Sequence, residues 1–223
     1  MTPQIEVQNV SKAFGGVQAN RGISLAVPQG RITGLIGPNG SGKTTLFNSV
    51  VGYHPIDSGS IRFEGREISR LRVPQIARLG LLRTFQQTRI YSKMNCVENM
   101  LISVPHRSGG WSTMFGAFPA ELVDKAEHLL EFAMALMNEP KTLLLDEPTA
   151  GINPTLINGL IDRLKRANEE FGITLFVIEH NMRVIMNLAE RIYCLAHGEL
   201  LAEGTPEAIR SDQRVIDAYL GAH

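Results

Sequence analysis

The chain has 223 residues, with 22 basic (Lys and Arg) and 22 acidic (Asp and Glu) side chains, so its formal net charge is zero. This balance argues against a general binder of nucleic acid or of membrane surfaces. No apolar run reaches the roughly 20 residues that a membrane-spanning helix needs, and Met1–Glu6 lack the features of a signal peptide. Cys96 and Cys194 have no metal-type spacing, so we expect reduced thiols in one globular domain.

The N-terminal part reads as strands that lead into a helix. Alternating apolar residues predict strands at 5–10, 23–27 and 32–36, and an apolar run predicts a helix at 45–51. The glycine-rich stretch 12–16 is expected to turn the chain, with Phe14 in an exposed place. Phe14 has two possible roles, to stack on a flat base or to cap the edge of the sheet, and composition does not decide between them.

Between the third strand and the helix lies the most informative stretch of the chain. It fits the pattern G-x-x-x-x-G-K-[ST], in which backbone N–H groups wrap a chain of phosphates. The strand before it and the helix after it are the context that this motif needs, because the helix N-terminus faces the anion. The predicted nucleotide-binding residues are Gly37, Pro38, Asn39, Gly40, Ser41, Gly42, Lys43, Thr44 and Thr45.

Within this loop two side chains have separate predicted roles. Lys43 is expected to reach the β- and γ-phosphates of a nucleoside triphosphate, and the Thr44 hydroxyl to hold Mg²⁺. The loop therefore predicts a protein that binds a nucleoside triphosphate together with magnesium.

The middle of the chain is less regular. A strand is expected at 60–64, a short helix at 74–79 that ends before Gly80, and a buried strand at 81–85 that ends at Gln86. Gln86 is a candidate ligand for Mg²⁺, although a loop glutamine often has no such role. Residues 88–137 change in composition, and they are either an insertion with a partner surface or a loop and helix packed on the main core.

An apolar strand at 143–147 ends in two adjacent carboxylates. Burial of Asp146 and Glu147 without a cation would be costly, which indicates that both side chains face a site. Asp146 is suited to bind Mg²⁺ and Glu147 to accept a proton from an attacking water.

The C-terminal third alternates again between helix and strand. Asn153 and Pro154 predict the start of a helix that runs to Phe171, and an apolar strand at 173–178 then leads to His180. A histidine at the end of an inner strand is well placed to reach a γ-phosphate. A hairpin across residues 191–203 and a helical piece at 206–220 complete an α/β pattern.

These motifs, in this order, resemble the ATPase subunit of an ATP-binding cassette (ABC) transporter over essentially the whole chain. The resemblance implies a P-loop NTPase fold with a RecA-like core, an antiparallel β subdomain and a shortened helical subdomain at about 88–137, in a single domain 1–223. It also implies that Phe14 stacks on adenine, that Gln86 is the glutamine of the Q-loop, that Glu147 is the catalytic glutamate and that His180 is the switch histidine. Residues 150–153 would be the D-loop.

Several segments are similar to the ATPases of branched-chain amino acid importers, among them 83–86, 177–182, 202–206 and 215–221. The resemblance implies an ATPase subunit that drives transport of a small solute through transmembrane permease subunits. It would pair with a second ATPase subunit, bind no nucleic acid and lie peripherally on the cytoplasmic face of the cell membrane.

One family motif is absent from the sequence. The signature LSGGQ, or a variant of it, opens the helix before the strand 143–147 in this family, and no such segment precedes residues 129–137 here. In the family each ATP lies between the phosphate loop of one subunit and the signature of the other. Two functions therefore stay open, a transport ATPase and a nucleotide-binding module with weak hydrolysis. A soluble ABC protein of translation or repair is disfavoured, because the chain has one cassette and no basic patch.

Overall fold

The computed structural model describes residues 3–84, 139–150, 152 and 154–220. The predicted helical subdomain at about 88–137 and the predicted Q-loop residue Gln86 lie outside this part of the chain. Among the described residues no helix is long and apolar enough to span a membrane.

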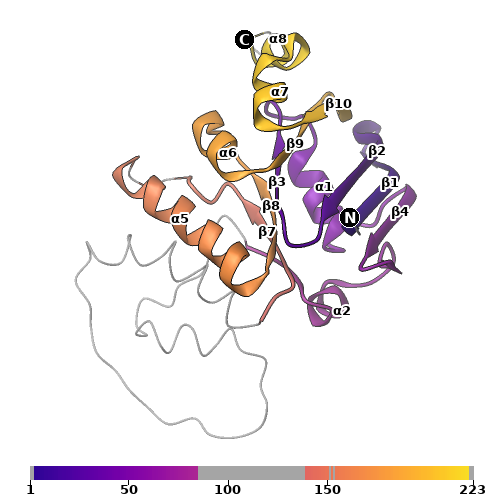
Figure 1. The fold of residues 1–223 in the computed structure, drawn as a ribbon. Coiled ribbons are helices and arrows are strands. Elements are labelled where there is room, and N and C mark those ends of the chain that lie inside the picture. The colour runs from indigo at the N-terminus through magenta and orange to yellow at the C-terminus, as the bar shows by residue number, and fades with distance from the viewer. Residues whose placement is uncertain (1–2, 85–138, 151, 153, 221–223) are drawn as a thin grey trace, which may run out of the picture.

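A six-stranded sheet forms the centre of the molecule (Figure 1). Its order is β10 (Glu199–Gly204), β9 (Arg191–Ala196), β3 (Ile32–Ile36), β8 (Thr174–Ile178), β7 (Thr142–Asp146) and β6 (Leu81–Arg83). The strands from β9 to β6 run parallel, and β10 is antiparallel to β9. Every residue of β3, β7 and β8 is buried, as expected for parallel strands that are covered on both faces.

A second, antiparallel sheet of four strands packs beside the first (Figure 1). Its order is β2 (Val17–Pro28), β1 (Pro3–Phe14), β4 (Ser58–Phe63) and β5 (Arg66–Glu67). The short helix α2 (Val73–Arg78) follows β5 and leads into β6. These strands form the antiparallel β subdomain that the resemblance implies.

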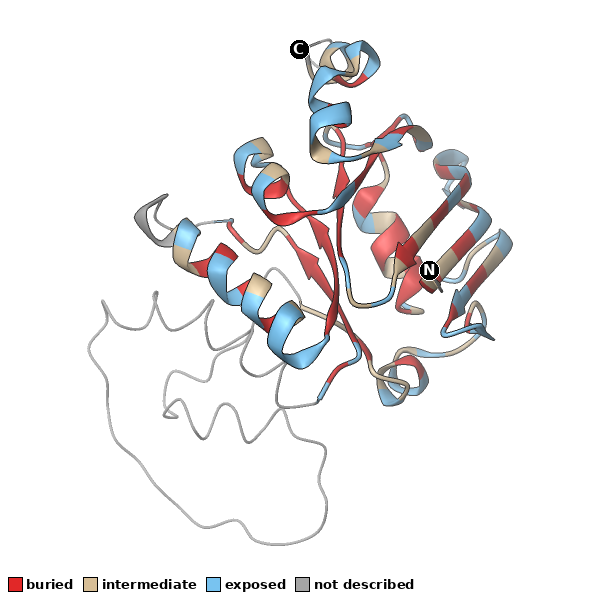
Figure 2. Cartoon of the chain, in the orientation of Figure 1, coloured by how far each residue is buried: buried red, intermediate tan, exposed pale blue. Residues whose placement is uncertain are grey.

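Helices cover both faces of the central sheet. The helices are α1 (Lys43–Val50), α5 (Pro154–Phe171), α6 (Met182–Leu188), α7 (Pro206–Ser211) and α8 (Gln213–Leu220). Helix α1 packs between the two sheets, where Leu46 and Phe47 share one core with β1, β2 and β4. Helices α5 to α8 supply a second core on the opposite face, and Figure 2 shows the buried stripe of α5 turned toward the sheet.

Four sequence predictions are wrong in their extent. Strand β1 continues through the stretch that was expected to turn, because Lys12 and Ala13 pair with Asn20 and Gln18 of β2, so the turn is confined to residues 15–16. Strand β2 is longer than predicted for the same reason. Strand β6 ends at Arg83, and the helical piece at 206–220 is two helices that separate at Asp212.

Helix α6 was not predicted, although its start has a local sequence signal. The Asn181 side chain accepts hydrogen bonds from the backbone N–H groups of Arg183 at 3.1 Å and Val184 at 3.4 Å, so it caps this helix. The hairpin of β9 and β10 is confirmed, with His197 and Gly198 both at positive φ in its turn. Cys194 is a free and buried thiol, as expected, and burial raises its pKa to about 11.

Candidate functional site

The loop between β3 and α1 holds its shape through close backbone packing. Gly37 has a φ of 148° and Gly42 a φ of 97°, both in the region that favours glycine. A Cβ atom at Gly42 would lie 2.2 Å from the carbonyl oxygen of Ala19, and one at Gly37 would lie 2.2 Å from that of Leu195. The loop is therefore wedged between β2 on one side and β9 on the other, where only glycine fits.

Lys43 lies at the first position of α1 and turns back onto this loop. Its Nζ atom donates hydrogen bonds to the carbonyl oxygens of Gly37 at 2.8 Å and Pro38 at 2.9 Å, and the side chain is 5% exposed. Burial lowers the pKa of Lys43, and the negative charges of Glu147 and Asp146 act against that shift. The ammonium group is thus held by neutral carbonyls close to two carboxylates.

Three parallel strands bring the predicted residues to one edge of the sheet. Leu35 of β3 lies in register with Ile178 of β8, and Ile178 in turn with Asp146 of β7. The residues that follow these positions are therefore neighbours, although those after β3 are more than a hundred positions before the others in the chain. The carboxyl edge of an open α/β sheet is where such folds bind their ligands.

Asp146 is buried and paired with Arg83 at the end of β6. The Arg83 guanidinium donates to Oδ2 of Asp146 and to Oδ1 of Asn48, and it lies 5.9 Å from the centre of the Phe47 ring. No described residue donates a hydrogen bond to Oδ1 of Asp146, which is also buried. An orphaned carboxylate oxygen at this edge fits a cation that arrives with a ligand.

Glu147 and His180 are in contact across the ends of β7 and β8. Oε1 of Glu147 forms a hydrogen bond with Nε2 of His180, and the backbone N–H of Glu147 donates to the carbonyl oxygen of Ile178 at 2.9 Å. Both side chains remain partly exposed. The structure therefore brings together the two residues that were predicted to act on an attacking water and on the γ-phosphate.

Glu179 and Arg83 are site residues that the sequence predictions missed. The Glu179 carboxylate is 3% exposed and accepts hydrogen bonds from the Thr149 hydroxyl at 2.7 Å and from the backbone N–H groups of His180 and Asn181 at 2.9 and 3.0 Å. The available signal was a charged residue directly after a strand that is buried throughout and almost entirely apolar. For Arg83, the signal was a single cation at the end of an apolar strand.

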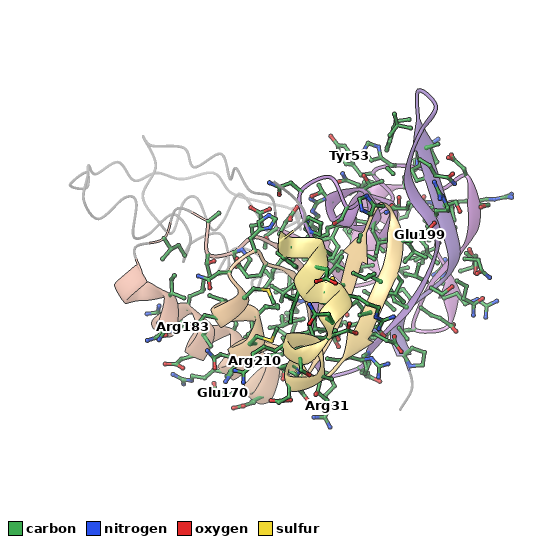
Figure 3. The ribbon with its side chains drawn as sticks, turned by 90° about the horizontal axis from the view of Figure 1, so that it is seen from above. Arg31, Tyr53, Glu170, Arg183, Glu199 and Arg210 are labelled. Atoms are coloured by element: carbon green, nitrogen blue, oxygen red, sulfur yellow. The ribbon has the colours of Figure 1, made fainter. Side chains whose placement is uncertain are left out.

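Two other predicted site residues that the structure describes are Phe14 and Thr44. Phe14 ends β1 and is 44% exposed, with its ring 5.1 Å from that of His54 in an edge arrangement. The Tyr53 ring lies beside His54, and Figure 3 shows Tyr53 on the outside of the molecule. Thr44 is exposed at the start of α1. In the described part of the chain no group of three or more His, Cys, Asp and Glu side chains is arranged to hold a metal by itself.

This arrangement can bind a chain of phosphates. Free backbone N–H groups at the start of α1 and a buried lysine form an anion site, and two carboxylates and a histidine face it from the neighbouring strands. A cation bridged by phosphates and a water held by Glu147 would both fit at this edge.

Comparison with known proteins identifies the family. The family model "ABC transporter" matches residues 20–150, and the model "Branched-chain amino acid ATP-binding cassette transporter" matches residues 199–223. The protein BraF of Pseudomonas aeruginosa, named a high-affinity branched-chain amino acid transport ATP-binding protein, is 36% identical over 251 residues that cover 98% of both chains. LivG of Escherichia coli K12, which carries the same description, is 34% identical over 98% of both chains.

Solved structures agree with these relatives. The ADP conformation of an ATP-binding cassette of an ABC transporter is 29% identical, covers 99% of this chain and superimposes with a TM-score of 0.85. A nucleotide-free ATP-binding cassette gives a TM-score of 0.84 at 28% identity. The alignment with BraF runs over 251 residues whereas this chain has 223, so that relative contains residues with no counterpart here. The chain belongs to the ABC transporter family, as one of its nucleotide-binding ATP-binding cassettes.

Proposed function

We propose that this protein is the ATP-binding subunit of an ABC importer, and that it hydrolyses Mg·ATP to drive a small solute through a membrane permease. The observation that carries this proposal is the meeting of Lys43, Asp146, Glu147 and His180 at the ends of three adjacent strands. A phosphate loop alone would support binding, whereas a carboxylate and a histidine beside it support hydrolysis.

The nucleotide is held at two places. The residues from Gly37 to Thr45 cradle the phosphates, and Lys43 exchanges its bonds to the loop carbonyls for bonds to the β- and γ-phosphates. Phe14 supplies a flat, partly exposed ring for the adenine base, and the edge contact with His54 fixes the tilt of that ring.

Magnesium fits the residues at this edge. Asp146 has a buried Oδ1 atom to which no described residue donates, and Thr44 presents its hydroxyl at the start of α1. Mg²⁺ commonly uses one or two protein ligands together with substrate phosphates, which agrees with the lack of a separate metal cluster among the described residues. When bound, the ion would neutralise charge on the phosphates; Gln86, a further proposed ligand, lies outside the described residues.

Glu147 and His180 act on the reacting groups. Glu147 accepts the proton of the attacking water, and His180 orients that carboxylate and reaches the γ-phosphate. The backbone of Lys43 and its neighbours at the start of α1 adds fixed dipoles that favour the negative charge.

The transported solute is proposed from the relatives. BraF and LivG are named for branched-chain amino acid transport, and the match of residues 199–223 to a family model with that description favours the same class of solute here. A permease and a second ATPase subunit would be its partners, on the cytoplasmic face of the membrane.

A nucleotide-binding module with weak hydrolysis is the second candidate function. It is favoured by the absence of an LSGGQ-type segment from the sequence and by the residues of BraF that this chain lacks. The ATPase rate at constant Mg·ATP, measured alone and with a partner ATPase that carries a signature, separates the two. Turnover by the chain alone supports the transport ATPase, and turnover only with the partner supports the module.

The central claim is tested by Lys43→Ala. Removing the ammonium group takes charge-assisted hydrogen bonds from the phosphates, so ATP affinity should fall by at least roughly tenfold in a direct titration. Lys141→Ala is the matched control, because Lys141 is exposed and pairs with Glu64. Unchanged ATP affinity of Lys43→Ala would remove the proposal.

A further inference from the structure

The C-terminal helix α8 touches the start of the phosphate loop. The backbone N–H of Gly37 donates a hydrogen bond to the hydroxyl oxygen of Tyr219 at 2.8 Å, across 182 positions of the chain. Tyr219 is half-buried on α8 and packs against the same core as the buried residues Val215 and Cys194. The Tyr219 side chain, which is held in place by this packing, thus accepts the hydrogen bond from the Gly37 N–H.

Gly37 is the point at which the loop leaves the sheet. Ile36 pairs with Cys194 of β9, and the chain then turns at Gly37 with a φ of 148°. The Gly37 carbonyl oxygen accepts a hydrogen bond from Lys43 at 2.8 Å, so residue 37 is held through its N–H by Tyr219 and through its carbonyl by Lys43. Only the first of these bonds can persist when Lys43 moves to bind phosphate.

Two further residues of α8 border an open pocket beside the outer part of the loop. Asp217 and Ala218 line a pocket of about 360 Å³ together with His197 and residues 38–41 of the loop. This open space leaves room for the outer part of the loop to adjust around a ligand, while its first residue stays attached to α8. Burial raises the pKa of Tyr219 to about 12, so its hydroxyl stays neutral at the pH of any binding assay.

We propose that Tyr219 is a positioning residue that anchors the start of the phosphate loop through the Gly37 N–H. While Lys43 exchanges its bonds to the loop carbonyls for bonds to phosphate, Tyr219 keeps residue 37 in the conformation that aims the loop at the nucleotide. The C-terminal helix therefore helps to set nucleotide affinity without touching the nucleotide. This inference rests on the proposed function only in that the loop binds phosphate.

The test compares two Tyr→Phe substitutions that remove one buried hydroxyl each. Tyr219→Phe removes the acceptor for Gly37, whereas Tyr193→Phe removes a hydroxyl that bonds the backbone N–H and carbonyl of Ala26, away from the loop. We expect Tyr219→Phe to weaken binding of ADP and of ATP by about two- to tenfold in calorimetric titrations. Tyr193→Phe should bind both nucleotides like the parent, even if its Tm falls as much as the Tm of Tyr219→Phe.

Two results would overturn the anchor. One is parental affinity in a folded Tyr219→Phe protein, and the other is an equal loss of affinity in both variants, which would be a general effect of lower stability. If the parent chain itself does not bind ADP or ATP, the proposed function fails instead.

If Tyr219→Phe does not fold, a measurement on the unmodified protein tests the anchor instead. Hydrogen exchange of the Gly37 amide, followed by NMR without nucleotide and again with ADP, should be at least roughly tenfold slower than the rate for an unbonded amide in both states. Exchange at the unbonded rate in either state would show that Tyr219 does not hold the loop there.

Discussion

Glu147 has a left-handed backbone conformation, with a φ of 52°. Such a conformation costs a non-glycine residue on the order of 1–3 kcal/mol, and it persists where the surroundings enforce it. Here the hydrogen bond from its N–H to the carbonyl of Ile178 at 2.9 Å fixes the turn that follows β7. The turn directs the carboxylate toward His180, which agrees with the proposed role of Glu147 in activating water.

At the scale of this residue, we expect Glu147→Gln to bind ATP like the parent and to lose turnover. The amide is close in size to the carboxylate but does not accept the proton of the water, so the steady-state ATPase rate should fall by roughly 10²- to 10⁴-fold. Glu64→Gln is a suitable control, since that carboxylate is exposed and pairs with Lys141. Hydrolysis at the parental rate by Glu147→Gln would show that Glu147 is not the base.

At the scale of elements, the ends of β7 and β8 are joined by one buried carboxylate. The Glu179 carboxylate accepts hydrogen bonds from the Thr149 hydroxyl, in the turn after β7, and from the backbone N–H groups of His180 and Asn181, which follow it in the chain after β8. His180 is the residue between Glu179 and the Asn181 cap of α6, so its place depends on these bonds. The two turns that present Glu147 and His180 are therefore fixed relative to each other.

We expect Glu179→Ala to loosen this connection. The N–H groups of residues 180 and 181 and the Thr149 hydroxyl would lose their acceptor, which should cost about 1–3 kcal/mol of the free energy of unfolding. ATPase turnover should fall more than ATP affinity, because the phosphate loop is not part of this network. Glu199→Ala is the control, as Glu199 pairs with Arg21 on the surface and is labelled in Figure 3.

For Glu179→Ala, the informative comparison is between the change in kcat and the change in ATP affinity. Both are measured at a temperature at which Glu179→Ala and the control Glu199→Ala are fully folded. A loss of affinity as large as the loss in kcat would mean that Glu179 supports the whole site. Unchanged kcat would mean that His180 keeps its place without Glu179.

At the scale of the whole molecule, one chain supplies only part of the site that the proposed function requires. The central sheet and α1 supply the phosphate loop, Asp146, Glu147 and His180 from one chain. In the proposed function, the signature of a second ATPase subunit would supply further donors to the γ-phosphate. Lost donors of this kind commonly cost 10²–10³ in rate, on the order of 3–4 kcal/mol each.

The chain should therefore bind Mg·ATP as a folded monomer and hydrolyse it slowly as a homodimer. Insertion of an LSGGQ-type segment before Leu129 should raise homodimer turnover by roughly 10²- to 10³-fold. An inserted Gly/Ser segment of the same length is the control and should leave the rate low. If the chain without any insertion already hydrolyses ATP as fast as the chain with the LSGGQ-type segment, the signature is dispensable here.

The sequence determined the local parts of this protein. The glycines, Lys43 and Thr44 identify the phosphate loop by their spacing. The apolar runs at 32–36 and 173–178 predict buried strands, because burial on both faces demands such runs. Asp146, Glu147 and His180 were predicted for the same reason, as polar residues at the ends of such strands. The turn after β1 was misplaced, and residues 206–220 were predicted as one helical piece without the break at Asp212, because strand pairing and helix ends depend on neighbours outside the local window.

Only the tertiary structure decided which distant residues meet. The pairing of Arg83 with Asp146, the three bonds to Glu179 and the bond from Gly37 to Tyr219 join residues that follow no common sequence pattern. They form because β3, β8, β7 and β6 lie side by side in register and α8 packs back against the same sheet at β10. Strand order and helix docking result from burying the two cores on either face of the central sheet, which is a property of the whole chain and not of any single segment.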